Sequence, residues 1–215
     1  MNVRILVTGF AGSDEQLNAS GELAISLSRD LPGELADLDS ILDFELLYCN
    51  GNTREEEHLS VINELSRIVS LYKPGICIFT GQAPIYNRIR IERFATNYFL
   101  GSPIDADAPA AYAATLPGNE EIPAILNGYN LPSGHSNYAG QHTCNHILFS
   151  LLHLANRQGF DCKAGFIHIP VLPEQVANAS EFPFIDSPHM TLEQTRTAVV
   201  YVIRHVVHKE NSDVG

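Results

Sequence analysis

Short apolar runs with few polar interruptions are the feature that most constrains the fold of this chain. RILVTGF (residues 4–10), GICIFT (75–80) and GFIHI (165–169) have the length and composition of strands. Such runs are typical of parallel strands that helices cover on both faces. Segments with helical periodicity lie between them. We therefore expect an α/β fold, a three-layer α/β/α sandwich with a mostly parallel, twisted central sheet.

The other elements are predicted from periodicity and from residues that start or stop helices. Ser20 is expected to cap a helix that ends near Pro32, and Thr191 with Gln194 forms the pattern of a capping box. Further helices are predicted at residues 54–71 and 120–126, further strands at 44–49 and 93–100, and irregular loops at 101–117 and 170–188.

Length and charge restrict the domain organisation and the partners. A chain of 215 residues without an internal linker predicts one domain over residues 1–209, followed by a frayed tail at 210–215. The net charge of -12 and the lack of clustered Lys and Arg argue against nucleic acid and anionic membranes as partners. No apolar run is long enough to cross a membrane and no signal-peptide pattern is present, so we expect a cytoplasmic protein.

Cys144 lies at the start of a predicted helix, in YAGQHTCNHILFSLLHLANRQG. Apolar residues recur there at helical spacing, and Gly159 stands where a C-cap glycine belongs, so the helix is expected to begin near residues 141–143. A thiol in the first turn faces the positive end of the helix dipole and unpaired N–H groups, which favour the thiolate. Cys144 is therefore a candidate nucleophile. The alternative is a small buried apolar residue at a helix start.

His168 and Glu92 are polar residues within apolar segments. His168 lies in the strand pattern GFIHI, where a buried imidazole needs a partner, and its alternative is a satisfied core histidine. Glu92 lies in IRIERF, and its alternative is an ordinary ion pair with Arg88, Arg90 or Arg93. A cysteine, a histidine and an orienting third group close in space would form the activated nucleophile of a thiol hydrolase.

Four segments carry a resemblance to a known family. They are TGF near the start, GQA followed by IERFATN, the helix start YAGQHTCNH, and AGFIHIPVLPEQV. Their order and spacing, from about residue 4 to residue 176, are similar to those of pyroglutamyl-peptidase I, the intracellular pyrrolidone carboxyl peptidases. The cysteine and histidine segments are the most specific, and the glutamate segment follows.

The resemblance implies both a catalytic triad and an activity. The triad is Cys144 as nucleophile, His168 as general base and then acid, and Glu92 as the group that orients the imidazole. The implied enzyme is a cysteine omega peptidase that releases an N-terminal pyroglutamyl residue from blocked peptides through an acyl-thioester, without a cofactor. Family members pack a phenylalanine on the pyroglutamyl ring, here Phe10, and Asn18 and Gln82 fall in pocket-forming segments. The resemblance also implies a homo-oligomer, commonly a tetramer.

Two departures from the family pattern concern the substrate pocket. The first turn reads TGFAGSDE where family members typically read TGFEPFGG, so Ser13 replaces an aromatic residue. Tyr86 stands where the family usually has an arginine. The sequence leaves open whether these changes keep, shift or abolish pyroglutamyl specificity. The alternatives are therefore a cysteine amidohydrolase of shifted specificity and a non-catalytic relative that binds a peptide or small molecule.

The histidines also raise the question of a metal site. Only His142 and His146, on either side of Cys144, share a helical face, and no second cluster of ligands stands at a suitable spacing. We therefore expect no metal.

Overall fold

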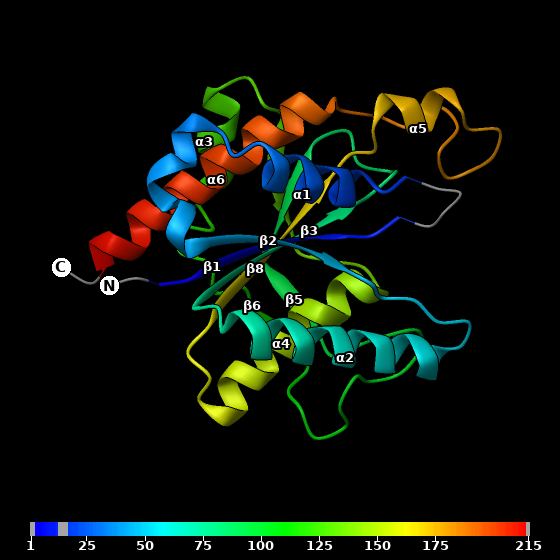
Figure 1. The fold of residues 1–215 in the computed structure, drawn as a ribbon. Coiled ribbons are helices and arrows are strands. Elements are labelled where there is room, and N and C mark those ends of the chain that lie inside the picture. The colour runs from blue at the N-terminus through cyan, green and yellow to red at the C-terminus, as the bar shows by residue number, and fades with distance from the viewer. Residues whose placement is uncertain (1–2, 13–16, 214–215) are drawn as a thin grey trace.

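A computed structural model describes residues 3–12 and 17–213 of the chain (Figure 1). Its central sheet has six strands in the order β2 (Leu42–Leu47), β1 (Ile5–Phe10), β3 (Ile76–Gln82), β8 (Lys163–Ile169), β4 (Ile89–Glu92) and β7 (Ser133–Ser136). All neighbouring strands in this sheet are parallel except β4 and β8, which are antiparallel. The predicted mostly parallel sheet is therefore confirmed. A separate two-stranded sheet joins β5 (Phe94–Thr96) and β6 (Ala111–Ala113).

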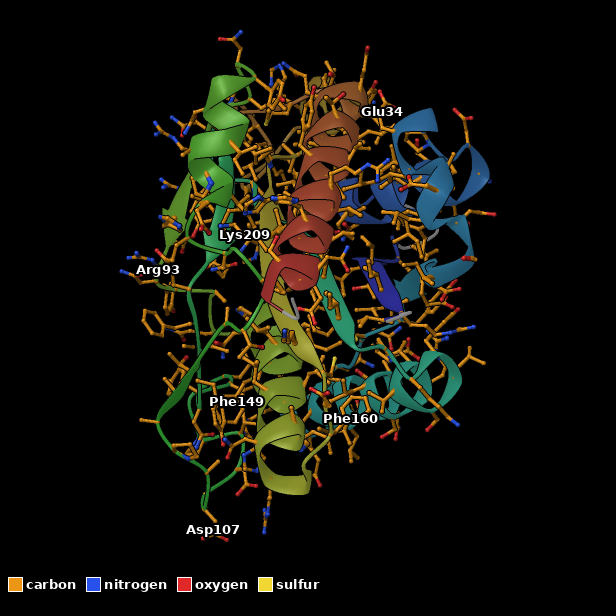
Figure 2. The ribbon with its side chains drawn as sticks, turned by 90° about the vertical axis from the view of Figure 1, so that its left-hand side faces the viewer. Glu34, Arg93, Asp107, Phe149, Phe160 and Lys209 are labelled. Atoms are coloured by element: carbon orange, nitrogen blue, oxygen red, sulfur yellow. The ribbon has the colours of Figure 1, made fainter. Side chains whose placement is uncertain are left out.

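Helices cover both faces of the sheet. One face carries α1 (Ala19–Arg29), α3 (Ile122–Gly128), α6 (Leu192–Asp213) and the 3-10 segment η1 (Gly33–Ile41), and the other carries α2 (Arg54–Tyr72) and α4 (Thr143–Gln158) (Figure 1). The short helix α5 (Pro173–Ala177) follows β8. Figure 2 shows Lys209 on α6 in one outer layer and Phe149 on α4 in the other. Each layer buries its own apolar cluster against the sheet, which confirms the three-layer sandwich.

Alternation along β8 sends successive side chains into different layers. Ile167 and Ile169 belong to the apolar cluster of α1 and α6, whereas Phe166 belongs to that of α2 and α4. Because strand side chains alternate with a period of two, His168 faces the same side as Phe166. The histidine and helix α4 therefore share one face of the sheet.

The order of the strands places a topological switch point at the centre of the sheet. The chain goes from β1 to β2 on one side and then to β3 on the other side of β1. In open α/β sheets, ligands bind where the strand order reverses, outside the carboxyl ends of the strands. Helix α1 packs very closely here, because a Cβ atom on Gly9 would lie 1.9 Å from the carbonyl oxygen of Ser20. Only glycine permits this approach.

Several element boundaries differ from those predicted. Helix α1 is capped by Asn18, and Ser20 instead lies within the helix, where its Oγ accepts a hydrogen bond from the N–H of Phe10. The predicted strand at residues 93–100 is only the short β5, because the apolar alternation of β4 precedes it. The loops predicted at 101–117 and 170–188 contain β6 and α5, respectively.

The C-terminal helix is longer than predicted. It continues to Asp213 rather than fraying from residue 210. The predicted capping box is present at its start, where the N–H of Thr191 donates to Gln194 Oε1 and the N–H of Gln194 donates to Thr191 Oγ1. None of the helices in the described part of the chain is long and apolar enough to cross a membrane.

Candidate active site

Cys144 lies in the first turn of α4, as predicted. The helix begins at Thr143, with His142 at the cap position, and ends at Gly159, whose φ of 65° is left-handed. The backbone N–H groups of a first helical turn have no partner within the helix and carry the positive end of its dipole. Cys144 is only partly buried. Its sulfur therefore lies at a position that stabilises negative charge and that a small molecule can reach.

Side-chain hydrogen bonds hold the start of α4. The fully buried Asn145 donates from Nδ2 to the carbonyl oxygens of Thr96 (2.9 Å) and Tyr98 (2.8 Å). Thr143 Oγ1 donates to Glu57 Oε1 at 2.6 Å. Sequence reasoning did not single out Asn145, although a buried asparagine next to a candidate nucleophile is a usable signal, because its amide must find partners.

The start of α2 also contacts α4 through a pair of histidines. His146 Nε2 lies 2.8 Å from His58 Nδ1, and Ser150 Oγ lies 3.0 Å from His146 Nδ1. Burial lowers the pKa of His146 to about 4, and the neighbouring His58 and Arg54 add to this effect. His146 is therefore neutral near pH 7.

Glu92 and His168 form a buried hydrogen-bonded pair. Glu92 Oε1 lies 2.8 Å from His168 Nδ1, and the glutamate side chain is completely buried. The antiparallel pairing of β4 with β8 places Arg90 opposite His168, so Glu92 stands two residues further along on the same face. The alternative of an ordinary ion pair with a neighbouring arginine is wrong for the described residues: Arg93 pairs with Glu120 instead.

His168 also contacts Cys144. Burial lowers the pKa of His168, but the hydrogen bonds with Cys144 and with Glu92 outweigh this effect and raise it to about 9. The imidazole is therefore mostly protonated near pH 7, and its positive charge lies between the sulfur and the carboxylate. The three side chains stand in the order thiol, imidazole, carboxylate, which is the order that an activated cysteine needs.

Gly81 makes room for the sulfur. The parallel pairing of β3 with β8 sets Gly81 beside His168. A Cβ atom at Gly81 would lie 3.1 Å from Cys144 Sγ and 2.7 Å from the ring of Phe166. The sequence shows only a Thr-Gly pair after a strand, which indicates a tight turn. The sequence does not show that a larger residue here would crowd Cys144, because the two residues come together only in the folded structure.

The predicted pocket residues lie at the carboxyl ends of β1 and β3. Phe10 is mostly buried, with its ring centre 6.4 Å from that of Phe166, on the same face as Cys144. Gln82 Oε1 accepts hydrogen bonds from the N–H of Ala19 and from Gln175 Nε2, both at 2.9 Å. Gln175 was not singled out from the sequence. Gln175, in α5 after β8, bonds to Gln82 at the end of β3 and to the carbonyl oxygen of Leu17 before α1.

Asn18 has a structural task at this edge. Its Oδ1 accepts hydrogen bonds from the N–H of Ser20 at 3.0 Å and from Ser20 Oγ at 2.8 Å, which caps α1. Its role in binding a substrate stays a prediction. Ser13, the other departure from the family pattern in this segment, lies outside the described residues.

Tyr86 packs against the histidine. Its ring meets that of His168 edge-on, with the centres 5.8 Å apart and an interplanar angle of 75°. The ring of Phe166 also lies next to the imidazole, at 4.6 Å between centres. The residue that replaces the usual family arginine is thus in direct contact with the candidate base. Among residues 3–12 and 17–213, no group of three His, Cys, Asp or Glu side chains lies close enough to hold a metal ion.

Comparison with known proteins assigns the family. The sequence profile described as "Pyroglutamyl peptidase" matches residues 3–209. A pyrrolidone-carboxylate peptidase of Thermococcus litoralis is 34% identical over 166 residues, which cover 70% of this chain and 75% of that protein. Pyrrolidone-carboxylate peptidase 1 of Caldanaerobacter subterraneus subsp. tengcongensis is 31% identical over 94% of this chain and 98% of its own length.

The solved structures agree with the sequence comparison. The solved structure of the pyrrolidone carboxyl peptidase from Thermococcus litoralis superposes with a TM-score of 0.81 at 29% identity, covering 98% of this chain and 96% of that one. The pyroglutamyl peptidase I of Bacillus amyloliquefaciens superposes with a TM-score of 0.78 at 25% identity, covering 96% and 98% of the two chains. The fold, the order of the elements and the sequence thus point the same way: this chain belongs to the pyroglutamyl peptidase family of cysteine peptidases.

Proposed function

We propose that this chain, as a cysteine-type pyroglutamyl peptidase, hydrolyses the amide bond that follows an N-terminal pyroglutamyl residue by means of Cys144, His168 and Glu92. The observation that carries the proposal is the buried hydrogen bond between Glu92 Oε1 and His168 Nδ1, with Cys144 beside the same imidazole. The names of the relatives support the substrate, because pyrrolidone carboxylate is the pyroglutamyl group.

The first chemical step is attack by sulfur. His168 takes the proton of the Cys144 thiol, the sulfur attacks the carbonyl carbon of the pyroglutamyl residue, and a tetrahedral oxyanion forms. The backbone N–H of Cys144 points from the start of α4 and is a suitable donor to that oxyanion. Glu92 holds Nδ1 of the imidazole, which leaves Nε2 to exchange the proton with sulfur and substrate.

The second half of the reaction releases both products. His168 donates its proton to the nitrogen of the leaving peptide, the C–N bond breaks, and an acyl-thioester remains on Cys144. Water, deprotonated by His168, then attacks the thioester and releases pyroglutamate. The thiol is restored when the sulfur takes back the proton. None of these reaction steps needs a cofactor.

Substrate selection is assigned to the end of β1 and the end of β3. Phe10 supplies an apolar wall for the uncharged lactam ring. The Oε1 atom of Gln82 is already used by two donors, so its Nε2 group is the atom available to donate to a lactam oxygen. Asn18 is also assigned to the pocket, because it lies at the start of α1 near these strand ends. Its Oδ1 atom already accepts the hydrogen bond that caps α1. The predicted homo-oligomer and cytoplasmic location stay predictions.

The test is an assay of a fluorogenic L-pyroglutamyl amide. Wild type is expected to release pyroglutamate, and Cys144→Ala to lose at least about 10³-fold in kcat. Cys49→Ala is the matched control, because Cys49 is also partly buried, while burial first, and then Glu64, Cys144 and Glu57, raise its pKa to about 12. Iodoacetamide should abolish the activity of wild type and of Cys49→Ala.

Two outcomes would point to the alternatives. Iodoacetamide-sensitive hydrolysis of other acyl amides without hydrolysis of the pyroglutamyl amide would indicate a cysteine amidohydrolase of shifted specificity, the alternative that Tyr86 in place of the family arginine favours. A folded protein that hydrolyses none of these amides would contradict an enzyme and support a binding relative.

A further inference from the structure

Two arginines near the active site lack an acidic partner in a strongly acidic protein. The chain has 25 Asp and Glu against 13 Lys and Arg. Ion pairs with carboxylates are formed by six arginines: Arg4, Arg67, Arg93, Arg157, Arg196 and Arg204. Within the described residues, Arg88 and Arg90 form none. Arg88 Nε donates only to Asn87 Oδ1, and Arg90 Nη1 donates to the carbonyl oxygen of His135 at 3.1 Å.

Arg90 is connected to the catalytic histidine through one aromatic ring. Its guanidinium carbon lies 5.4 Å from the ring centre of Tyr86, and the same ring centre lies 5.8 Å from that of His168. The distance between the guanidinium carbon of Arg90 and the ring centre of His168 is therefore at most the sum of these two distances. The tyrosine face and the His135 carbonyl hold it in one orientation, which reduces the entropy lost when it binds an anion.

Arg88 lies beside Arg90, over strand β7. A Cβ atom on Gly134 would lie 3.1 Å from Arg90 Nη1 and 3.8 Å from Arg88 Cδ. The absence of a side chain at Gly134 leaves room for the guanidinium of Arg90, whereas Arg88 would be at an ordinary contact distance from such an atom. Arg93, which follows in the sequence, differs from both: it stands at the edge of the molecule in Figure 2 and is neutralised by Glu120.

The chemistry determines which part of a substrate comes near these arginines. His168 must donate its proton to the leaving nitrogen, so the residue that follows the pyroglutamyl group leaves from the histidine side. That residue has its Cα within about 3.8 Å of the preceding Cα, and a glutamate side chain or a chain-terminal carboxylate extends several ångströms further. Its charge therefore reaches the neighbourhood of Tyr86 and Arg90.

We propose that Arg90, with Arg88 beside it, binds a carboxylate on the residue that leaves, so that the enzyme prefers pyroglutamyl peptides with an acidic leaving residue. The proposal rests on the proposed function and specifies its substrate class. The carboxylate comes either from an acidic side chain or from the free C-terminus of a pyroglutamyl dipeptide. A guanidinium suits both, because its planar fork pairs with carboxylates in a bidentate way.

The experiment compares kcat/KM of the full chain on matched pairs of substrates. The first pair is pyroglutamyl-Glu amide and pyroglutamyl-Gln amide, which differ in one charge. The second pair is pyroglutamyl-Ala with a free carboxylate and pyroglutamyl-Ala amide. Wild type is expected to prefer the charged member of at least one pair by about twofold to fivefold at low salt, the range of a partly exposed ion pair. The pair that shows the preference identifies the source of the carboxylate.

Variants of the arginines separate this proposal from other causes. Arg90→Gln should bring the ratio close to one, Arg90→Lys should retain part of it, and Arg88→Gln should lower it less. High salt should also lower the ratio, because the charges are partly exposed. Arg29→Gln is the control, since Arg29 is exposed like Arg88 and has no ion pair among the described residues but lies in the last turn of α1. It should keep the wild-type ratio.

The outcomes distinguish this proposal from the proposed function. Hydrolysis of all four substrates with a ratio near one in both pairs would overturn the anion subsite and leave the peptidase in place. A preference that survives in Arg90→Gln and in the double variant with Arg88→Gln would overturn it as well. Thermal melting of each variant verifies that it is folded, and failure to hydrolyse any of the four would instead contradict the peptidase itself.

Discussion

Glu92→Gln removes one negative charge from the site and keeps the size of a completely buried side chain. In the wild type, burial lowers the pKa of His168, and the hydrogen bonds with Cys144 and Glu92 raise it from the usual 6.5 to about 9. A hydrogen bond to a charged partner contributes about 1.5–3 kcal/mol, against about 1 kcal/mol for a neutral one. The difference of about 0.5–2 kcal/mol corresponds to a pKa of His168 that is lower by about one unit in the variant.

The rate should follow this pKa. His168 must be protonated to donate to the leaving nitrogen, so kcat falls when the pH rises through the pKa of His168. The alkaline limb of the kcat profile is therefore expected near pH 9 in the wild type and about one unit lower in Glu92→Gln, so that kcat falls by about fivefold near pH 9 and little near pH 7.

The measurement is kcat of a pyroglutamyl amide between about pH 5 and 10, together with the pH dependence of alkylation by iodoacetamide. Glu120→Gln is the control, because Glu120 is an exposed carboxylate that pairs with Arg93 and does not bond to His168. An alkaline limb that stays in place in Glu92→Gln, whatever the loss of rate, would refute the assignment of Glu92 as the group that charges the imidazole.

The free energy of unfolding should also depend on pH through the raised pKa of His168. The folded-state pKa of His168 is raised above the usual 6.5 to about 9, so the folded state binds the proton more tightly than the unfolded chain. Its contribution to the free energy of unfolding is therefore complete below pH 6.5 and is lost as the pH rises through about 9. Urea unfolding across this window should show a smaller loss in Glu92→Gln than in the wild type.

Two further predictions concern the surroundings of Cys144. Gly81→Ala places a methyl group against Cys144 Sγ and the ring of Phe166, so unfolding should require about 1–3 kcal/mol less and kcat should fall further than that loss of stability explains; a variant with wild-type kcat would contradict this packing. His146→Gln tests the buried histidine, whose folded-state pKa is lowered from 6.5 to about 4 by burial, so wild-type stability should decline as the pH falls through this range. Chemical denaturation at several pH values should show a flatter acid limb in His146→Gln, and an equally steep limb would show that His146 is not responsible.

The sequence alone determined the layers and the location of the candidate nucleophile. Unbroken apolar strands and the helical periodicity around Leu148 are local patterns, and they predict a covered parallel sheet and a helix that starts beside Cys144. The C-cap at Gly159 and the capping box at Thr191 were predicted for the same reason. Each depends on residues within a few positions of one another.

Tertiary structure decided which polar side chains meet. Glu92 is surrounded by arginines in the sequence, yet it bonds to His168 because β4 runs antiparallel beside β8 and brings the two side chains to the same face. The need for glycine at position 81 likewise arises from Cys144 and Phe166, which are distant in the sequence but adjacent to it in space. Backbone periodicity is a property of neighbouring residues, whereas the partner of a buried charge depends on which strands lie side by side. That choice is made only when the whole sheet assembles.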